Sequence, residues 1–225
     1  MSRVALVTGG SRGLGKALAG ALIERGWTVV IDGRDSEAVA ETQAEMESDR
    51  LFAVNGDVTD PKHRTTLAEA VKEHGDLDLL VNNASFLGPS PQPRLERFPL
   101  DVLRSVYEVN VVAPLALLQE FLSSLRRSHG VVVNITSDAA IEGYEGWGGY
   151  GSSKAALEQM TRILAAEEPE LSIYWVDPGD MNTRMHQEAY PGEDISDRPP
   201  PESSVPGLIR LIEERPASGR YQARA

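Results

Sequence analysis

The amino-acid sequence predicts an α/β protein whose core is a doubly wound, parallel β-sheet with helices on both faces. Short apolar runs alternate along the chain with longer stretches that carry apolar residues every three or four positions, as strands and amphipathic helices do. The runs are nearly continuous in Val, Leu and Ile, which is typical of strands covered on both faces. Because each strand is followed by a helix, right-handed crossovers would link parallel neighbours.

Six apolar runs are predicted to be strands, and stretches of helical periodicity lie between them. The strands are expected at residues 4–7, 28–31, 51–54, 77–81, 131–135 and 173–176. The helices are expected at residues 14–25, 37–47, 62–74, 101–127 and 150–167. A short helix near 203–214 and a last strand near 219–222 follow.

One segment departs from this regularity. Residues 181–205 contain Pro191, Gly192, the three consecutive prolines 199–201 and several acids, and they are predicted to form a long loop. Loops of this length in a compact domain are usually functional or disordered. We interpret this one as a lid that closes over the substrate and excludes water.

Length and charge limit the classes of function. The chain has 225 residues, 41% of them apolar, enough to bury the core of one large domain spanning residues 1–225. Lys and Arg number 22 and Asp and Glu 34, for a net charge of −12. Phosphate backbones would be repelled, so nucleic acid is not an expected partner. The acidity itself is interpreted as a solubilising surface.

The chain contains no cysteine, which excludes disulfides, thiolate nucleophiles and thiolate metal sites. The four histidines lack metal-ligand spacing, so we predict no metal and expect them at the surface or at helix ends: His63, His74, His129 and His186. The first apolar run is too short for a signal peptide, and no stretch reaches the roughly 18 to 20 residues that span a bilayer. We therefore expect a cytoplasmic protein with no membrane partner.

A glycine-rich turn joins the first predicted strand to the first helix. It reads Thr8-Gly9-Gly10-Ser11-Arg12-Gly13-Leu14-Gly15. Glycines permit a tight turn, and backbone N–H groups at a helix N-terminus can bind a pyrophosphate with help from the helix dipole. A glycine-rich turn without a ligand is the plainer alternative, but the strand, turn and helix context favours nucleotide binding.

The spacing Thr-Gly-x-x-x-Gly-x-Gly resembles that of the short-chain dehydrogenase/reductase family, and the resemblance runs from Val4 to about Thr183. It implies a Rossmann-like sheet of about seven strands in the order 3-2-1-4-5-6-7. It also implies an oxidoreductase that transfers a hydride between a nicotinamide cofactor and a small-molecule carbonyl or secondary alcohol. Family members commonly assemble through their long helices, so a homodimer or homotetramer is implied. In the first turn, the resemblance assigns cofactor binding to Thr8, Gly9, Ser11, Arg12, Gly13, Leu14 and Gly15.

The residues after the second strand bear on the choice between NADP and NAD. Asp32, Gly33 and Arg34 lie where the adenine ribose is held in such folds. NAD-dependent members place a carboxylate at the position aligned with Gly33, whereas Arg34, with Arg12 nearby, suits a 2′-phosphate. NADP(H) is therefore predicted. A shift of the alignment by one residue onto Asp32 would favour NAD(H) instead.

Three further strand ends match the family's cofactor-binding motifs. The family holds adenine after its third strand, here with Asp57 and Val58. After the fourth strand, Ser85 replaces the last glycine of the family's Asn-Asn-Ala-Gly. After the sixth, the chain matches Pro-Gly-x-x-x-Thr, whose backbone would meet the nicotinamide carboxamide. The residues assigned to these two motifs are Asn83, Ala84, Ser85, Pro178, Gly179, Met181 and Thr183.

Tyr150 and Lys154 lie four residues apart at the start of a predicted helix, so both project from one face. A phenol with a pKa of about 10 is a poor acid at neutral pH, and a nearby ammonium stabilises the phenolate and lowers that pKa. The resemblance adds Ser137 and Asn110. In it, Tyr150 exchanges the proton with the substrate oxygen, Ser137 bonds the same oxygen, and Lys154 binds the nicotinamide ribose. Asn110 holds a water that links Lys154 to solvent.

Two other functions stay open. One is a catalytically silent protein that senses NADPH, although a pure sensor has no need of Tyr150. The other is a lyase or isomerase that reduces its cofactor only transiently. The sequence does not identify the substrate, and the hydroxyls of Thr136 and Ser152 rank below that of Ser137. An apolar, partly aromatic group of side chains would either line the pocket or simply pack: Phe86, Leu87, Ala139, Tyr144 and Trp147.

Overall fold

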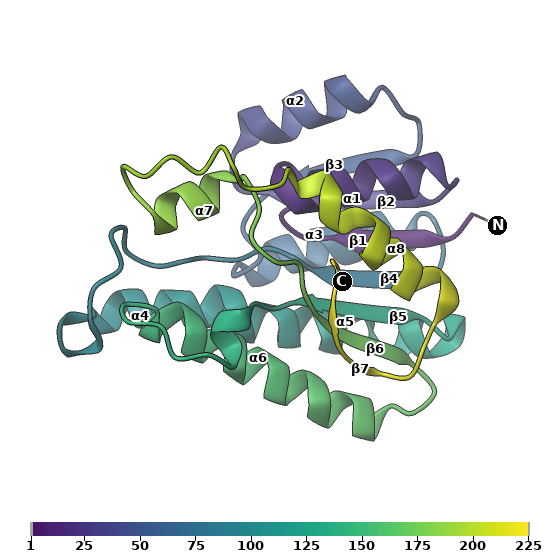
Figure 1. The fold of residues 1–225 in the computed structure, drawn as a ribbon. Helices are drawn as coiled ribbons and strands as arrows, with labels where there is room; N and C mark the ends of the chain where they lie inside the picture. The colour runs from purple at the N-terminus through teal and green to yellow at the C-terminus, as the bar shows by residue number, and fades with distance from the viewer. Residues whose placement is uncertain (1, 225) are drawn as a thin grey trace.

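A computed structural model describes residues 2–224, and its seven strands form one parallel sheet (Figure 1). The strand order is β3-β2-β1-β4-β5-β6-β7, which confirms the predicted doubly wound arrangement. The three central strands are buried apart from Asp78 of β4, as expected for apolar strands covered on both faces. The strands are β1 (Val4–Val7), β2 (Thr28–Gly33), β3 (Leu51–Asn55), β4 (Leu77–Asn82), β5 (Val131–Ile135), β6 (Ser172–Asp177) and β7 (Gly219–Gln222).

Helices cover both faces of this sheet, and each face has its own apolar core. One core involves α1 (Gly13–Glu24), α2 (Ser36–Met46) and α8 (Val205–Glu214). The other involves α3 (Pro61–Lys72), α5 (Ala113–Ser128) and α6 (Gly148–Glu167). Within residues 2–224, no helix combines the length and apolar character that crossing a membrane requires.

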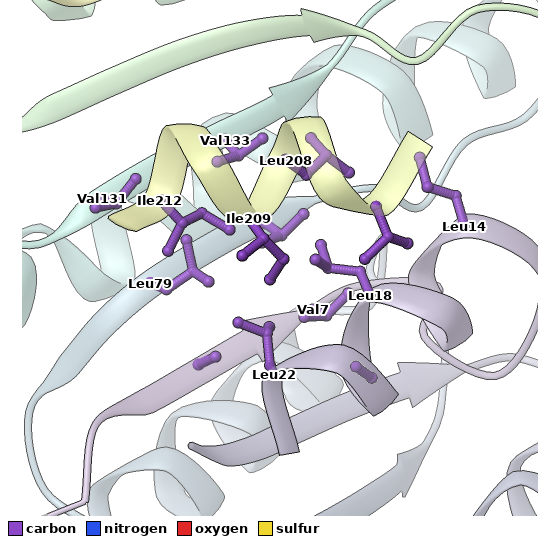
Figure 2. Close-up of a cluster of buried hydrophobic side chains, with 14 of the residues drawn as sticks. Val7, Leu14, Leu18, Leu22, Leu79, Val131, Val133, Leu208, Ile209 and Ile212 are labelled. Carbon is purple, nitrogen blue, oxygen red and sulfur yellow. The ribbon is translucent and has the colours of Figure 1, made fainter. Parts of the chain in front are cut away.

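Helix α8 covers the core on the face of the sheet that it shares with α1. Its apolar face carries Leu208, Ile209 and Ile212, which point towards β1, β4 and β5 and towards α1 (Figure 2). The partners on those elements are Val7, Leu79, Val131, Val133, Leu14, Leu18 and Leu22. Because α8 leads directly into β7, its packing also sets the position of the last strand.

The single helix predicted over residues 101–127 is interrupted. The structure has α4 (Leu100–Tyr107), a π-helical turn over Glu108–Val112, and then α5. Pro114 has no backbone N–H, so it cannot complete the regular bond to the carbonyl of Asn110. The Ala113 N–H instead bonds the Glu108 carbonyl, five residues back. Such π-turns occur frequently at functional sites.

The segment 181–205, expected to be a loop, is partly helical. It contains α7 (Arg184–Ala189) and a 3₁₀ turn at Pro201–Ser204. The Thr183 hydroxyl accepts a hydrogen bond from the His186 N–H at 3.2 Å and so caps the start of α7. This local capping was not recognised in a stretch whose composition suggested irregular structure.

Candidate active site

The glycine turn after β1 has the geometry of a phosphate-binding site. Gly9 adopts φ +63°, a left-handed conformation that favours glycine. Helix α1 begins at Gly13, and its capping residue Arg12 makes no side-chain capping bond. The first N–H groups of α1 therefore have no side-chain acceptor, and they lie at the positive end of the helix dipole. These features fit the diphosphate of a dinucleotide.

The ends of β1 and β4 are joined by the predicted motif residues. The Thr8 hydroxyl accepts from the N–H groups of Asn83 and Ala84, each at 3.0 Å. The Asn83 amide donates to the carbonyls of Thr8 at 2.8 Å and Gly9 at 3.1 Å. Four of the predicted residues thus bond one another and shape the glycine turn.

Asp32 is turned away from the position of a ribose. Its Oδ1 accepts from the Gly9 N–H at 2.7 Å, and its Oδ2 lies 3.1 Å from His63 Nε2. Both side chains are buried. The alternative in which Asp32 binds the adenine ribose is therefore not supported by this geometry. His63 does lie in the first turn of a helix, as expected, but it is buried and paired, and the sequence pattern did not indicate this.

Gly33 lies in a crowded position, where a side chain would require Ser11 to move. A Cβ atom there would lie 2.5 Å from the Ser11 Oγ and 3.0 Å from Val39 Cγ2. Two guanidinium groups flank this position. Arg12 forms an ion pair with Asp35, and Arg34 lies 3.9 Å from the Asp57 carboxylate. Both arginines are exposed and could exchange these carboxylates for a phosphate.

After β3, two residues that the resemblance assigns to adenine binding differ in burial: Asp57 is partly exposed and Val58 is buried. The Asp57 carboxylate accepts from the N–H and the hydroxyl of Thr59, at 2.9 and 2.8 Å. Val58 is buried in the core that contains α3 and α5. Asp57 is thus available at the surface next to Arg34, while Val58 supports the turn from below.

Tyr150 and Lys154 both lie on α6 and are buried. The Lys154 Nζ lies 5.5 Å from the centre of the Tyr150 ring and donates to the Ile135 carbonyl at 2.8 Å. Burial raises the pKa of Tyr150 above its ordinary value, although a hydrogen bond with Ser85 acts in the opposite direction. Burial also lowers the pKa of Lys154 to about 7. The expected lowering of the Tyr150 pKa by Lys154 stays a prediction.

Lys154→Met is expected to make the stability of the protein less dependent on pH. The pKa of Lys154 is about 7 in the fold against an ordinary value of 10.5, so the unfolded chain binds more protons between these values. Wild-type stability therefore gains a contribution as pH rises from 7 to 10.5, and below pH 7 the full penalty for the buried charge applies. The stability of the variant relative to wild type should fall by roughly 2 to 4 kcal/mol between about pH 6.5 and about pH 10.

Urea unfolding at several pH values measures this difference. The matched control is Lys72→Met, which removes an exposed lysine from the end of α3. Its stability relative to wild type should stay nearly constant over the same range. A constant difference for Lys154→Met as well would contradict the lowered pKa.

Asn110 lies in the π-turn and bridges two parts of the site. Its Oδ1 accepts from the Phe86 N–H at 2.8 Å and the Ser85 hydroxyl at 3.1 Å. Its Nδ2 donates to the Phe86 carbonyl at 3.0 Å and to Ser153 Oγ at 2.9 Å. The amide thus ties the loop after β4 to α6, and four protein bonds already occupy it. The water expected at Asn110 would therefore have to bind the backbone carbonyl of Asn110. That carbonyl receives no hydrogen bond from Pro114, because proline has no N–H.

Ser137 follows β5 and faces a carboxylate. Its hydroxyl donates to Asp138 Oδ1 at 2.8 Å. The two competing hydroxyls make other bonds: Thr136 donates to Glu158 at 2.8 Å, and Ser152 donates to the Gly149 carbonyl at 3.1 Å. Of these three hydroxyls, that of Ser137 borders the cavity next to Tyr150 and is not bonded to a group in the protein interior.

The loop after β6 is held by the C-terminal segment. Arg224 Nε donates to the Pro178 carbonyl at 3.1 Å, and Nη2 donates to the Asp180 carbonyl. The Ser204 hydroxyl also donates to Pro178, at 2.7 Å. These bonds position the segment that contains Pro178 and Gly179, which the sequence assigned to the nicotinamide.

A buried ionic cluster below Ser137 was not anticipated from the sequence. Arg220 of β7 donates to Glu158 at 3.0 Å and to the Ser137 carbonyl at 3.2 Å, and it lies 3.5 Å from the Asp177 carboxylate. Glu158 and Asp177 are buried. The only available signal was indirect: Glu158 lies one helical turn beyond Lys154, and Arg220 is a charged residue within an expected strand. Arg220 thus connects the last strand to α6 and to the catalytic region.

A cavity of about 110 Å³ brings two of the four predicted catalytic residues, Ser137 and Tyr150, together with the residues expected at the nicotinamide, whereas Asn110 and Lys154 do not line it. Of the expected pocket residues, Leu87 and Trp147 line it, whereas Phe86 packs in the core against α3 and α5. Tyr144 is half exposed, and its hydroxyl bonds Asp138. The lining consists of Leu87, Thr136, Ser137, Asp138, Trp147, Tyr150, Asp177, Pro178, Gly179, Asp180, Met181, Thr183, Met185, His186 and Ala189.

Comparison with known proteins gives a consistent result. The model of the short chain dehydrogenase family matches residues 3–194. A 3-oxoacyl-[acyl-carrier-protein] reductase of rhamnolipid biosynthesis from Pseudomonas aeruginosa is 38% identical, over 81% of this chain and 74% of that protein. An oxidoreductase of Saccharomyces cerevisiae with no characterised activity is 36% identical, over 82% of this chain and 73% of that one. A crystal structure of a short chain dehydrogenase from Shigella flexneri complexed with NADP has a TM-score of 0.90 and 28% identity, over 98% of this chain and 96% of that chain.

Proposed function

Because the chain belongs to the short-chain dehydrogenase family of oxidoreductases, we propose that it is an NADP(H)-dependent enzyme that interconverts a carbonyl compound and a secondary alcohol. The observation that carries this proposal is the cavity in which Ser137 and Tyr150 meet the loop after β6. Lys154 lies behind Tyr150 on the same helix. We further propose that residues 1–225 act as one cofactor-binding domain, since all seven strands join one sheet.

The side chains of the cavity supply the proton and orient the substrate. NADPH, when bound, supplies the hydride that adds to the carbonyl carbon. The Tyr150 phenol lines the cavity and would donate its proton to the carbonyl oxygen as negative charge develops there. Burial keeps the phenol protonated at neutral pH but makes it a weaker acid, and we propose that the nearby Lys154 ammonium offsets this when the cofactor is bound. Ser137 would turn its hydroxyl from Asp138 to that same oxygen. Lys154 would hold the nicotinamide ribose.

The residues around Gly33 support NADP(H) as the preferred cofactor. Arg12 and Arg34 can each present a guanidinium to a 2′-phosphate, and Gly33 carries no competing carboxylate. The Shigella flexneri structure was determined with NADP. NAD(H) remains the alternative cofactor, to be compared directly.

Arg34→Ala is expected to raise the KM for NADPH by about fivefold to thirtyfold, because it removes a charge-assisted bond to the 2′-phosphate. Arg12→Ala should act similarly. The KM for NADH, which lacks this phosphate, should change by less than about twofold. Steady-state kinetics with both cofactors measures the effect, and Arg97→Ala, an exposed arginine remote in sequence from the turn, is the control. Equal losses for NADPH and NADH would contradict a phosphate contact.

A panel of aldehydes and ketones, followed by the loss of NADPH absorbance, tests the enzyme assignment. Turnover of any carbonyl substrate, with matching alcohol formation, supports the proposal. Binding of NADPH without turnover across the panel would favour the sensor. Product formation without net change in nicotinamide absorbance would favour the lyase or isomerase.

We also propose a homo-oligomer and a moving lid. Exposed apolar side chains on α5 and α6, including Val112 just before α5, Leu115 and Ile163, suit a contact between copies of the chain. The lid proposal for residues 181–205 is supported by Met185 and His186 of α7, which line the cavity. Sedimentation of the protein measures its oligomeric state and so tests the first of these two proposals. A cytoplasmic location stays a prediction.

A further inference from the structure

We infer that the cavity beside Ser137 selects carbonyl substrates whose non-reacting end carries an alkylammonium group, with Asp138 as the counter-ion. This inference rests on the proposed function, because it names the class of substrate for the same site. It is carried by three observations: a carboxylate in the cavity with no cation of its own, the aromatic rings beside it, and a buried nitrogen without a partner.

Asp138 is held in place entirely by neutral groups. Its Oδ1 accepts from the Ser137 hydroxyl and from the Ala139 N–H, both at 2.8 Å. Its Oδ2 accepts from the Tyr144 hydroxyl at 2.9 Å. These bonds orient the carboxylate without neutralising its charge. Asp138 is exposed and lines the cavity, so its charge can act on a substrate bound there.

The other carboxylates of the cavity differ from Asp138 because each has a cationic partner. Asp177 lies 3.5 Å from Arg220, and Asp180 lies 3.7 Å from Arg198. Within the described part of the chain, no lysine, arginine or histidine lies within ion-pair distance of Asp138. A charge left uncompensated by the protein at a substrate cavity favours a ligand of the opposite sign.

Aromatic rings form the wall next to this carboxylate. Trp147 lines the cavity and packs edge-on against Tyr144 and Tyr150, with ring centres 6.3 and 5.8 Å away. Tyr190 lies 6.1 Å from Trp147 on the lid side. Aromatic faces attract organic cations, and their combination with a carboxylate suits alkylammonium groups in particular. A carboxylate-bearing substrate would instead face like charge at Asp138.

His186 provides a further polar atom at the same cavity. Its Nδ1 lies 3.9 Å from Asp180, and its Nε2 is buried with no hydrogen-bond partner among the described residues. Buried polar atoms are nearly always paired, so this nitrogen is available to a group that enters the cavity. It lies on α7, within the proposed lid, and lines the same cavity as Ser137.

Three para-substituted acetophenones test the inference: one with a trimethylammonium group, one with a tert-butyl group of the same shape, and one with a carboxylate. For each, kcat/KM is measured with wild type and with Asp138→Asn. The ratio of cationic to neutral substrate should fall about three- to tenfold in the variant, and the ratio of carboxylate to neutral substrate should rise by a similar factor. The intrinsic reactivities of the three ketones cancel in this comparison.

The controls separate a local charge effect from others. Glu69→Gln removes one negative charge from the exposed surface of α3 and should leave both ratios within about twofold of wild type. Asp138→Glu keeps the charge and should also preserve the preference for the cation. If Asp138→Asn does not fold, Asp138→Ser gives the same comparison, because serine is also uncharged.

The outcomes distinguish the inference from the function on which it rests. Ketones reduced with unchanged ratios in the Asp138 variant would overturn the inference and leave the reductase assignment intact. Ratios that shift equally in Glu69→Gln would overturn it as well, since net charge alone would then explain the preference. Failure of all three ketones together with the wider carbonyl panel would instead overturn the proposed function.

Discussion

Tyr150→Phe is expected to lower carbonyl reduction by about 10³-fold or more, while the affinity for NADPH changes by less than about twofold. The substitution removes only the phenol oxygen, and the ring keeps its packing against Trp147 and Leu87. Tyr150 is the hydroxyl in the cavity that burial keeps protonated at neutral pH. Without this hydroxyl, the carbonyl oxygen that gains negative charge during hydride transfer has no correctly placed proton donor.

Two measurements check this result. Steady-state assays with the most rapidly reduced ketone of the panel give the loss of turnover, and titration of NADPH fluorescence gives the affinity. Tyr107→Phe, at the end of α4, removes a hydroxyl of the same kind from outside the cavity and should retain activity. Retention of more than about a tenth of wild-type activity by Tyr150→Phe would refute its role as the proton donor.

Arg220→Met is expected to lower the free energy of unfolding by about 2 to 4 kcal/mol, the second large effect. The arginine is the cation shared by Glu158 and Asp177, which are 3% and 6% exposed. Removing it leaves two carboxylates in a poorly solvated position, and the penalty of an unpaired buried charge exceeds the value of the lost bonds. We expect a smaller loss of unfolding free energy than for a fully buried ion pair, because 23% of the Arg220 side chain is exposed.

A second substitution identifies the cause of this loss. In the Arg220→Met background, Glu158→Gln removes one of the unpaired charges and keeps an oxygen for the Thr136 hydroxyl, so about 1 kcal/mol or more should be recovered. Alone, in the presence of Arg220, Glu158→Gln should destabilise. Arg210→Met, on the exposed face of α8, is the matched control and should change stability by less than about 0.5 kcal/mol. Additive effects of the two substitutions would argue against a charge penalty.

Elements with strong local signals were predictable in detail. The strand Val131–Ile135 agrees with the predicted bounds, because four of its five residues are Val or Ile and no helical pattern competes. Helix α6 begins two residues earlier than expected, within the usual uncertainty of helix ends. The break in the helix over residues 101–127 was missed because its apolar periodicity continues through the π-turn. Pro114 was the local signal that could have indicated it.

Some features of the candidate site were likewise predictable from local sequence, and others were not. Tyr150 and Lys154 follow from spacing along one helix, and the glycine turn follows from its place between a strand and a helix. Their ionisation does not follow from spacing. The sequence led to a phenol pKa lowered by the lysine, whereas burial raises the pKa of Tyr150 and lowers that of Lys154. Desolvation depends on every residue packed around a group, which no local pattern reports.

By itself, the sequence determined the order of elements, the doubly wound sheet, and the chemistry available at the strand ends, because these depend on short-range periodicity and on residue type. Only the tertiary structure decided which polar groups meet. Arg220 reaches Glu158 across 62 residues of chain, and Asp32 turns inward to Gly9 and His63. Such partners are set by sheet register and helix packing, so the charge that Asp138 presents to a substrate became visible only once its neighbours were in place.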